Sequence, residues 1–326
     1  MTLVVFGIDA LDPDIVDSET HRNLALHSHK AIETIVSESG EPSTHELWPT
    51  IITGLPPEEH GLVLGNDGVA WGHPLLEFGS QVADVVLPGP LQSRIGAWLL
   101  TNTKADAFRT PASYFERNDI ATVFDAWRSK AIGIPNYVVD GNNHDREHSL
   151  RTSLGDLFER DPSATGGHRS ADPESFYNDC LEMAMVRTAR IRAALRSRAF
   201  DLVFGYTSAL DLVGHVAYQS PGMQEAIYEE MDEFVGELRA DLNGDDDLLI
   251  LSDHGLQNGI HTDKAMVAAT DPDLISPVES VTDIRETVED HLEGTNFSAG
   301  GREFATERSG DATAVREQLE DLGYMG

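Results

Sequence analysis

TLVVFGID, residues 2–9, is a short apolar run rich in β-branched side chains, and it ends at an acid, Asp9. LVFGYTS (202–208) and LLILSDHG (248–255) have the same form, with polar residues at the carboxyl end. Continuous apolar runs of this length are typical of strands buried on both faces of a parallel sheet. We therefore expect three buried strands, and ligand sites in such sheets lie at the carboxyl ends of the strands.

Helical patterns lie between these runs. Residues 175–198 carry apolar side chains at three-and-four spacing, and the preceding Asp-Pro-Glu supplies a cap. Residues 223–242 form a second such pattern, which ends at the sequence NGDDD. Residues 122–140 suggest a helix followed by one more strand. Strands that alternate with helices predict an α/β fold, here a three-layer α/β/α sandwich with a mostly parallel central sheet.

The 326 residues are enough to bury a sizeable core. We expect one catalytic domain over residues 1–293, interrupted at about 65–170 by a loop-rich insertion with weak periodicity. Such an insertion is a natural lid or substrate-selecting element. Residues 294–326 are expected to form an exposed linker and a short C-terminal helix.

The charge of the chain is strongly one-sided, with 56 acidic residues against 23 basic ones and a formal net charge of -33. This surface should repel duplex nucleic acid and anionic membranes. Because the acids are spread along the whole chain, we interpret them as adaptation to high salt, which screens self-repulsion. A specialised acidic surface for a partner is the alternative.

The start of the chain and its hydropathy predict a cytoplasmic protein. The first residues, MTLVVFGIDA, lack the basic segment of a signal peptide and lead directly into a strand pattern. No apolar run reaches membrane-spanning length. Cys180 is the single cysteine, so a disulfide framework or a cysteine-based metal site is excluded.

Carboxylates and imidazoles gather near the ends of the apolar runs. The set consists of Asp9, Asp211, His215, Asp253, His254 and His261. Divalent metal ions are bound by this mixture of carboxylate oxygen and imidazole nitrogen. Two such ions a few ångströms apart can stabilise both the attacking and the leaving oxygen of an in-line displacement at phosphorus. The set therefore indicates a site for divalent metal ions.

Each motif alone has a simpler explanation. An aspartate at a strand end, such as Asp9, often caps the following helix. The pair Asp211 and His215 could lie on a solvated helix face, and His261 could be exposed in a glycine-flanked loop. The adjacent Asp253 and His254 have no evident packing use after a strand. The metal hypothesis depends on the joint occurrence of all these motifs.

The stretch STHELWPTIITGLPPEEHG, residues 43–61, combines several hydroxyl groups with a helical pattern. Trp48, Ile51 and Ile52 share one helix face and should pack against the sheet. Gly54 should end the helix, since two prolines follow it closely. The stretch therefore predicts a packed helix whose first turn begins with hydroxyl side chains.

Four motifs together resemble the alkaline phosphatase superfamily, and within it the type I phosphodiesterase/nucleotide pyrophosphatase branch. They are VVFGIDALD (4–12), a threonine followed after eight residues by TGLPPEEHG (44–61), TSALDLVGH (207–215), and LLILSDHG (248–255) with a nearby histidine. The resemblance covers residues 2–265 and is specific as a set. It implies a hydrolase with two divalent ions, usually zinc, although aspartate-rich sites also accept manganese.

The resemblance also implies a role for each site residue. One ion would be bound by Asp9, Asp253, His254 and Thr44, and the other by Asp211, His215 and His261. Thr44 occupies the position of the family nucleophile, nine residues before Thr53. Metal coordination can activate a hydroxyl that is otherwise a poor nucleophile, and attack on phosphorus would form a phosphothreonine that water then hydrolyses.

Asn66 is the nearest candidate for the family asparagine that contacts a phosphoryl oxygen. It lies one residue beyond the expected position, and an Asn-Asp-Gly turn explains it equally well. No arginine typical of a phosphomonoesterase clamp can be assigned from motif spacing, which favours a diester or pyrophosphate substrate.

The expected partner is therefore a small-molecule phosphate ester. Phosphomonoesterase, phosphonate hydrolase and sulfatase-like activity of the same superfamily are alternatives. Sulfatases of the formylglycine type have a cysteine at the position of Thr44, which disfavours that activity. A non-catalytic metal-binding member of the superfamily is a further alternative. The physiological substrate and the oligomeric state are not predicted.

Overall fold

The computed structural model describes residues 1–37, 40–63, 110–139, 157–161, 168–218 and 220–294, together with Leu154. Its centre is a six-stranded sheet in the order β2-β10-β7-β1-β6-β3. The strands are β1 (Leu3–Ile8), β2 (Ser28–Glu33), β3 (Ser129–Ile132), β6 (Leu202–Thr207), β7 (Asp247–Leu251) and β10 (Lys264–Ala269). The three apolar runs of the sequence thus form the adjacent strands β7, β1 and β6.

The sheet is mixed. Strands β1, β6, β7 and β3 are parallel to one another, whereas β10 pairs antiparallel with both β7 and β2. Because β1 lies between β6 and β7, the polar residues that follow these three strands meet at one edge. Two small antiparallel hairpins complete the described strands: β4 (Phe158–Arg160) with β5 (His168–Ser170), and β8 (Gly255–Gln257) with β9 (Ile260–Thr262).

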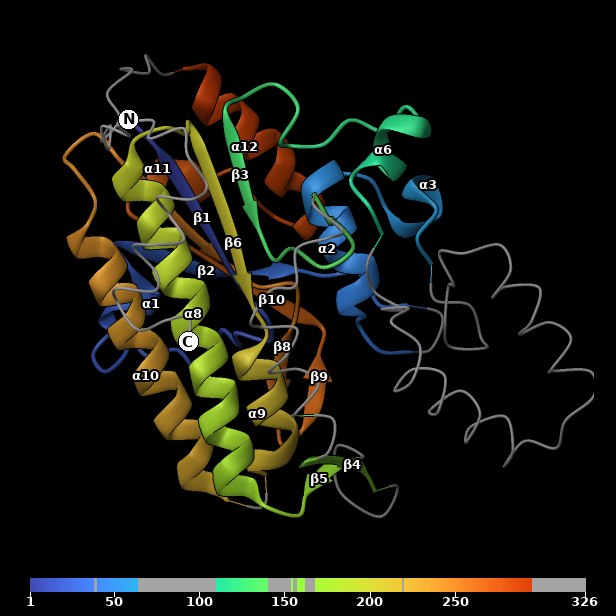
Figure 1. Ribbon diagram of the computed structural model, residues 1–326, viewed down its shortest axis with the longest axis vertical. Coiled ribbons are helices and arrows are strands. Elements are labelled where there is room, and N and C mark those ends of the chain that lie inside the picture. The colour runs from blue at the N-terminus through green and yellow to red at the C-terminus, as the bar shows by residue number, and fades with distance from the viewer. Residues whose placement is uncertain are drawn as a thin grey trace, which may run out of the picture.

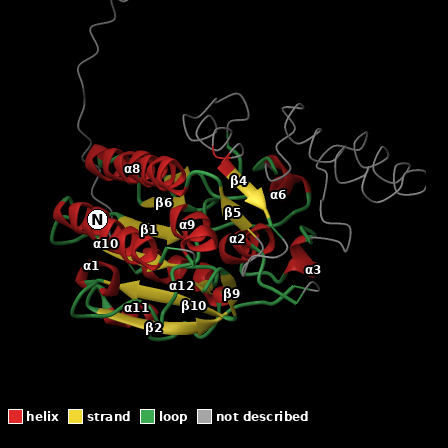
Figure 2. Ribbon diagram, turned by 90° about the horizontal axis from the view of Figure 1, so that it is seen from below, coloured by secondary structure: helices red, strands yellow, loops and turns green. Residues whose placement is uncertain are grey.

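Helices cover both faces of the sheet, as the sequence predicts (Figures 1 and 2). One face is covered by α8 (Pro173–Ser197), α10 (Pro221–Ala240), α9 (Ala209–Ala217) and the short α1 (Arg22–Ala25). The other face is covered by α2 (Thr44–Thr53), α12 (Ile284–Glu293), α11 (Pro272–Ile275) and the 3-10 turn Val281–Asp283. Short helices α3 (Pro57–His60) and α6 (Ser113–Arg117) lie beside α2.

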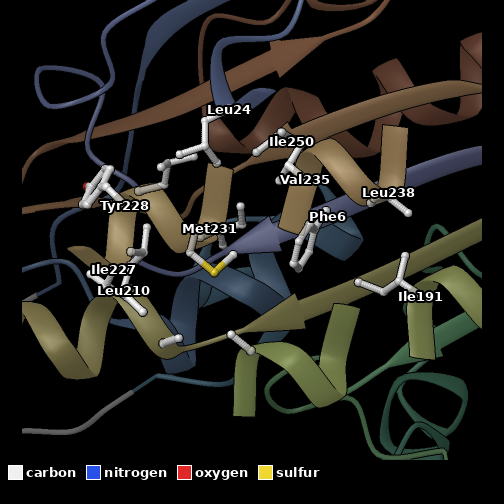
Figure 3. Close-up of a cluster of buried hydrophobic side chains, with 14 of the residues drawn as sticks. Phe6, Leu24, Ile191, Leu210, Ile227, Tyr228, Met231, Val235, Leu238 and Ile250 are labelled. Atoms are coloured by element: carbon white, nitrogen blue, oxygen red, sulfur yellow. The ribbon is translucent and has the colours of Figure 1, made fainter. Parts of the chain in front are cut away.

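Side chains of β1 alternate between two hydrophobic cores. Phe6 packs with Met231 and Val235 of α10 on one side (Figure 3), whereas Val5 packs with the core under α2 on the other. All residues of β1 are buried. A strand buried on both faces must be apolar at every position, which explains the unbroken run at residues 3–6.

Both long helices agree with the sequence prediction. Helix α8 begins after Asp172, whose side chain accepts a hydrogen bond of 3.2 Å from the Ser175 N–H group and so caps the first turn. The helix predicted at the start of residues 122–140 is wrong, although its strand is present as β3. Asp125 instead accepts hydrogen bonds from the backbone N–H and the hydroxyl of Thr122, and such local bonds compete with helix formation.

Most of the predicted insertion and the predicted C-terminal segment lie outside the described residues. Strand β3, near the middle of the insertion range, belongs to the central sheet. Among the residues that the structure describes, no helix is long and apolar enough to cross a membrane.

Candidate active site

The structure brings seven predicted site residues together at the carboxyl edge of the central strands. Asp9 follows β1, and α9, which begins two residues after β6, carries Asp211 and His215. Asp253 and His254 lie between β7 and β8, and His261 lies in β9. Thr44 is the first residue of α2. Residues more than two hundred positions apart therefore become neighbours because their strands are adjacent in the sheet.

Asp211, His215 and His261 form one cluster of potential metal ligands. Asp211 Oδ1 lies 3.3 Å from Nε2 of His215 and 3.3 Å from Nε2 of His261. The two Nε2 atoms are 3.0 Å apart. A helical spacing of four residues places Asp211 and His215 on one face of α9, where the β8–β9 hairpin presents His261 to them.

A second cluster lies next to the first one. His254 Nε2 is 3.4 Å from Asp9 Oδ1 and 3.5 Å from Asp253 Oδ2. Asp9, Asp211 and His254 also satisfy the geometry of a metal-binding group, so Asp211 lies within reach of both clusters. The Thr44 hydroxyl lies 3.3 and 3.4 Å from the two oxygens of Asp9 and 3.2 Å from His254 Nε2.

All three histidines are oriented alike. Nδ1 of His215, His254 and His261 lies 3.1, 3.1 and 3.2 Å from the backbone oxygens of Gly259, Gly255 and Pro42. Since a carbonyl oxygen only accepts, each Nδ1 carries a hydrogen, so that Nε2 is the nitrogen that offers a lone pair to a ligand when it is deprotonated. A metal-binding histidine commonly has this arrangement. The facing Nε2 atoms of His215 and His261 therefore suit a shared cation.

Asp253 is a further sign of a cation. Its side chain is completely buried, and within the described residues neither carboxylate oxygen has a hydrogen-bond partner. Burial raises the pKa of Asp253 to about 6. Buried carboxylate oxygens are normally hydrogen-bonded, paired with a positive group or bound to a metal. The donor set and this buried carboxylate without a hydrogen bond thus fit divalent ions.

The pKa shifts of the site residues reflect how closely the carboxylates are packed. Burial and the neighbouring Asp253 and Asp211 raise the pKa of Asp9 well above its usual value. Burial opposes ionisation of Asp211 too, but its two histidine partners hold the pKa of Asp211 well below its usual value. Burial would lower the pKa of His261, but contact with Asp211 raises it to about 9. Positive charge is therefore strongly favoured among these carboxylates.

Helix α2 places Thr44 by packing on the sheet. Trp48, one turn after Thr44, is completely buried, and its ring centroid lies 4.9 Å from that of Tyr206 in an edge-on contact. The same indole covers Gly7, where a Cβ atom would lie 2.3 Å from Trp48 Cη2. Gly7 precedes Asp9 by two residues, so one side chain fixes the helix against the strand that carries Asp9.

Tyr206 belongs to the site although it is not among the site residues predicted from the sequence. Its hydroxyl donates a hydrogen bond of 2.5 Å to Asp9 Oδ2. The only signal in the sequence is a phenol within the apolar run of β6. His168 of β5 was also not selected, and its ring lies 5.2 Å from that of His215 in an edge-on arrangement.

Other residues of the stretch 43–61 have structural contacts. The hydroxyls of Thr50 and Thr53 donate to the backbone oxygens of Glu46 and Pro49, and Gly54 ends α2 in the left-handed conformation at φ 68°. His60 is completely buried and joins α3 to α2. Asn66, predicted to contact the substrate, lies outside the described residues.

A family model described as type I phosphodiesterase/nucleotide pyrophosphatase matches residues 3–322. The match therefore includes every candidate site residue and nearly the whole chain. No curated protein matches the sequence significantly.

The solved structures that match this chain are distant from it in sequence. A protein from Pyrococcus horikoshii is 12% identical over 92% of this chain and 99% of that chain, with a TM-score of 0.43. Alkaline phosphatase from the Antarctic bacterium TAB5 is 11% identical over 90% of this chain and 99% of that chain, with a TM-score of 0.43. Murine ectonucleotide pyrophosphatase/phosphodiesterase 5 is 17% identical over 78% of this chain and 57% of that chain, with a TM-score of 0.34.

Proposed function

The chain belongs to the type I phosphodiesterase/nucleotide pyrophosphatase family of phosphate ester hydrolases, and from this premise we propose a two-metal phosphodiesterase or pyrophosphatase that acts through Thr44. One ion would be bound by Asp9, Asp253, His254 and the Thr44 hydroxyl. The other would be bound by Asp211, His215 and His261. We propose zinc for both ions because imidazole and carboxylate ligands suit it, with manganese as the alternative.

The position of the Thr44 hydroxyl carries this proposal. It is the hydroxyl that contacts both Asp9 and His254, at 3.2 to 3.4 Å, at the edge of the two ligand clusters. A threonine hydroxyl needs such surroundings because its unperturbed pKa makes it a weak nucleophile. Bound divalent ions would supply Lewis-acid activation of the hydroxyl and neutralise charge on the phosphoryl group.

In the proposed first step, Thr44 Oγ1 loses its proton to solvent and forms a bond to phosphorus while the bond from phosphorus to the leaving oxygen breaks, and the leaving oxygen takes up a proton from solvent. The Asp9 carboxylate lies within reach of the Thr44 hydroxyl and can accept a hydrogen bond from it before the reaction. Thr44 is the first residue of α2, so the phosphoryl group would lie at the N-terminus of this helix, where free N–H groups stabilise negative charge. Water then cleaves the phosphothreonine, which releases phosphate or its ester and restores the Thr44 hydroxyl.

A panel of model substrates tests the reaction class. The protein would be reconstituted with zinc or manganese and assayed with bis-nitrophenyl phosphate, nitrophenyl phosphate, a phosphonate ester and nitrophenyl sulfate. We expect the diester to give the highest kcat/KM. Dominant turnover of the monoester would support a phosphomonoesterase, and dominant turnover of the phosphonate or sulfate would support the corresponding alternative. Absence of turnover by the metal-loaded protein would support a non-catalytic metal-binding role.

Replacement of the nucleophile tests the proposed intermediate. Thr44→Ala should lower kcat by at least about a thousandfold, as removal of a catalytic nucleophile does in other enzymes. The variant should still bind metal because six ligands persist. Thr44→Ser, which keeps a hydroxyl, should retain part of the activity.

Thr53→Ala is the matched control, since the Thr53 hydroxyl lies on the same helix but donates to the Pro49 backbone oxygen. It should leave turnover nearly unchanged. Turnover by Thr44→Ala at the wild-type rate would disprove the role of Thr44.

A further inference from the structure

The β8–β9 hairpin supplies contacts to all three histidines of the site. His254 directly precedes β8, and its Nδ1 lies against the backbone oxygen of Gly255. His261 lies within β9. Gly259, in the turn between the strands, provides the backbone oxygen that fixes Nδ1 of His215 on α9. A shift of the hairpin would therefore displace ligands of both clusters.

The hairpin is too small to hold its own position. Each of its strands has only three residues, and a two-stranded hairpin is at best marginally stable in water. One side is anchored by Leu256, which is buried and packs against Gly214 of α9, where a Cβ atom would lie 2.6 Å from Leu256 Cδ2. Because side chains alternate along a strand, residues 255 and 257 face the opposite side.

Asp12 anchors this opposite side. Its carboxylate is buried and accepts hydrogen bonds from both strands of the hairpin: from Gln257 Nε2 to Oδ1 at 3.1 Å, and from the Thr262 hydroxyl to Oδ2 at 3.1 Å. Gly255 passes directly over it, so that a Cβ atom there would lie 2.4 Å from both Asp12 Oδ2 and Thr262 Oγ1. The Asp12 carboxylate is thus in close contact with the backbone of the hairpin.

Asp12 is itself fixed to the body of the protein. It follows β1 by four residues, and its backbone N–H group donates a hydrogen bond of 3.0 Å to the Tyr228 hydroxyl of α10. Its Oδ1 also accepts from the Asp14 N–H group at 2.9 Å. A rigid carboxylate that bonds both strands of a small hairpin restricts how far the hairpin can move.

We propose that Asp12 is a positioning residue of the active site, which holds the β8–β9 hairpin so that His261 and His215 meet Asp211 at one ion. This inference rests on the proposed metal-dependent function. Asp12 belongs to neither cluster of potential metal ligands, and it acts through Gln257 and Thr262. Residues hydrogen-bonded directly to metal ligands typically contribute about 10- to 100-fold to metal affinity or activity, and we take this range as the upper limit for Asp12, which bonds the neighbours of the ligands.

Zinc binding by Asp12 variants tests this role. The full chain would be stripped of metal and titrated with Zn²⁺ alone in the presence of a competing chelator. Asp12→Ala should bind the ion of the Asp211 cluster more weakly than the wild type, by up to about 10- to 100-fold. Asp12→Asn should bind nearly as the wild type, because its oxygen can accept from Gln257 while its amide donates to the Thr262 hydroxyl.

Asp246→Ala is the matched control for loss of a buried carboxylate. Asp246 accepts from the Thr2 N–H group at 2.8 Å and pairs with Arg198, at the opposite end of β7 from the site. This variant should unfold at lower urea concentration but bind zinc with unchanged affinity. Should Asp12→Ala fail to fold, Thr262→Val can replace it, because this variant removes the hydrogen bond from the Thr262 hydroxyl to Asp12. It should lower the affinity for the same zinc ion to a smaller extent.

The outcomes separate this inference from the function. A wild-type chain that binds no zinc would contradict the proposed two-metal function itself. A wild type that binds two ions, together with unchanged affinities in Asp12→Ala, would overturn the role of Asp12. The role would also be overturned if Asp12→Asn lost as much zinc affinity as Asp12→Ala. It would likewise be overturned if Asp246→Ala lost as much zinc affinity as Asp12→Ala.

Discussion

At the scale of single residues, Asp9 illustrates how neighbours orient a buried carboxylate. The Tyr206 hydroxyl donates a hydrogen bond to Oδ2 of Asp9, and His254 Nε2 lies next to Oδ1. The edge-on contact between Tyr206 and Trp48 connects the same phenol to the helix of Thr44. Asp9 and Thr44 thus share one rigid frame, and such preorganisation limits the reorganisation needed for a reaction.

His60 should make stability dependent on pH. Leu62 donates its N–H to His60 Nδ1, and Nε2 contacts the Glu46 backbone oxygen, which identifies a neutral ring. Burial lowers the pKa of His60 to about 4. The unfolded chain takes up a proton near pH 6.5, whereas the native one does not, so stability is complete above pH 6.5 and falls as the pH drops toward 4. The loss is about 3 kcal/mol at most.

Urea unfolding at pH 7 and at pH 4.5 measures this effect. The difference between the two pH values should be smaller in His60→Gln than in the wild type. His27→Gln is the control, because His27 is exposed. Equal pH dependence in wild type and His60→Gln would show that His60 is not neutral in the folded protein.

The sequence predicts which residues gather but not how they are held. Most of the six carboxylates and imidazoles are recognisable because they lie near the ends of apolar strands, and Thr44 is recognisable through the resemblance of residues 44–61 to the family motif. Tyr206 and Asp12 are not recognisable in this way. A tyrosine in an apolar strand is equally consistent with packing, and the contacts of Asp12 join residues 245 and 250 positions away. Only the tertiary structure reveals such partners.

At the scale of elements, the contact between α2 and β1 depends on a glycine. Gly7 lies between Tyr206 of β6 and Leu251 of β7, under the indole of Trp48. Without a Cβ atom at this position, the helix approaches the sheet closely. The distance between Thr44 and Asp9 is therefore set by the absence of one methyl group.

Gly7→Ala should displace Trp48 and with it the start of α2. Overpacking of a buried site typically destabilises by about 1–3 kcal/mol, and kcat should fall as Thr44 shifts from Asp9. Urea unfolding and steady-state kinetics measure the two effects. Gly222→Ala in α10 is the control, because a Cβ atom there meets nothing within 4 Å. Unchanged stability of Gly7→Ala would mean that α2 packs less tightly than described.

Long, periodic elements are predictable from the sequence, and short ones are not. The strands β1, β6 and β7 and the helices α8 and α10 have strong patterns. Strand β10, with the sequence KAMVAA, is rich in alanine, which favours helices, and it is a strand because β7 and β2 flank it. The β8–β9 hairpin has too few residues for a period to appear.

At the scale of the whole molecule, repulsion among acids competes with a set of ion pairs. Arg192 and Arg196 of α8 both pair with Asp241 at 2.6 Å. Ion pairs at the protein surface are typically worth about 0–1 kcal/mol each and weaken in salt. The formal net charge of -33 greatly exceeds what these pairs can compensate. Repulsion should therefore dominate the response to salt.

Stability should rise with potassium chloride. Between 0.1 and 1 M the screening length falls from about 10 to about 3 Å, which removes most repulsion between exposed acids. We expect the urea midpoint to increase over this range. A decrease would contradict adaptation to high salt.

A row of glutamates on α10 allows the repulsion between acidic residues to be tested directly. Glu225, Glu229 and Glu233 are exposed at four-residue spacing on α10, and like charges at this spacing each destabilise by about 0.2–0.5 kcal/mol at low salt. Replacement of all three by glutamine should stabilise the protein at 0.1 M and flatten its salt dependence. If the urea midpoint of this variant depended on salt as strongly as that of the wild type, other acidic residues would be responsible for the salt dependence.

The strand order also has a consequence for synthesis on the ribosome. Strand β1 is made first but occupies the middle of the sheet, between β6 and β7. It gains its first neighbour only when residue 207 has been made and its second at residue 251. His261 is made later still. The nascent N-terminal half therefore exposes an apolar strand with two unpaired edges, and it needs protection from aggregation until the last quarter of the chain emerges.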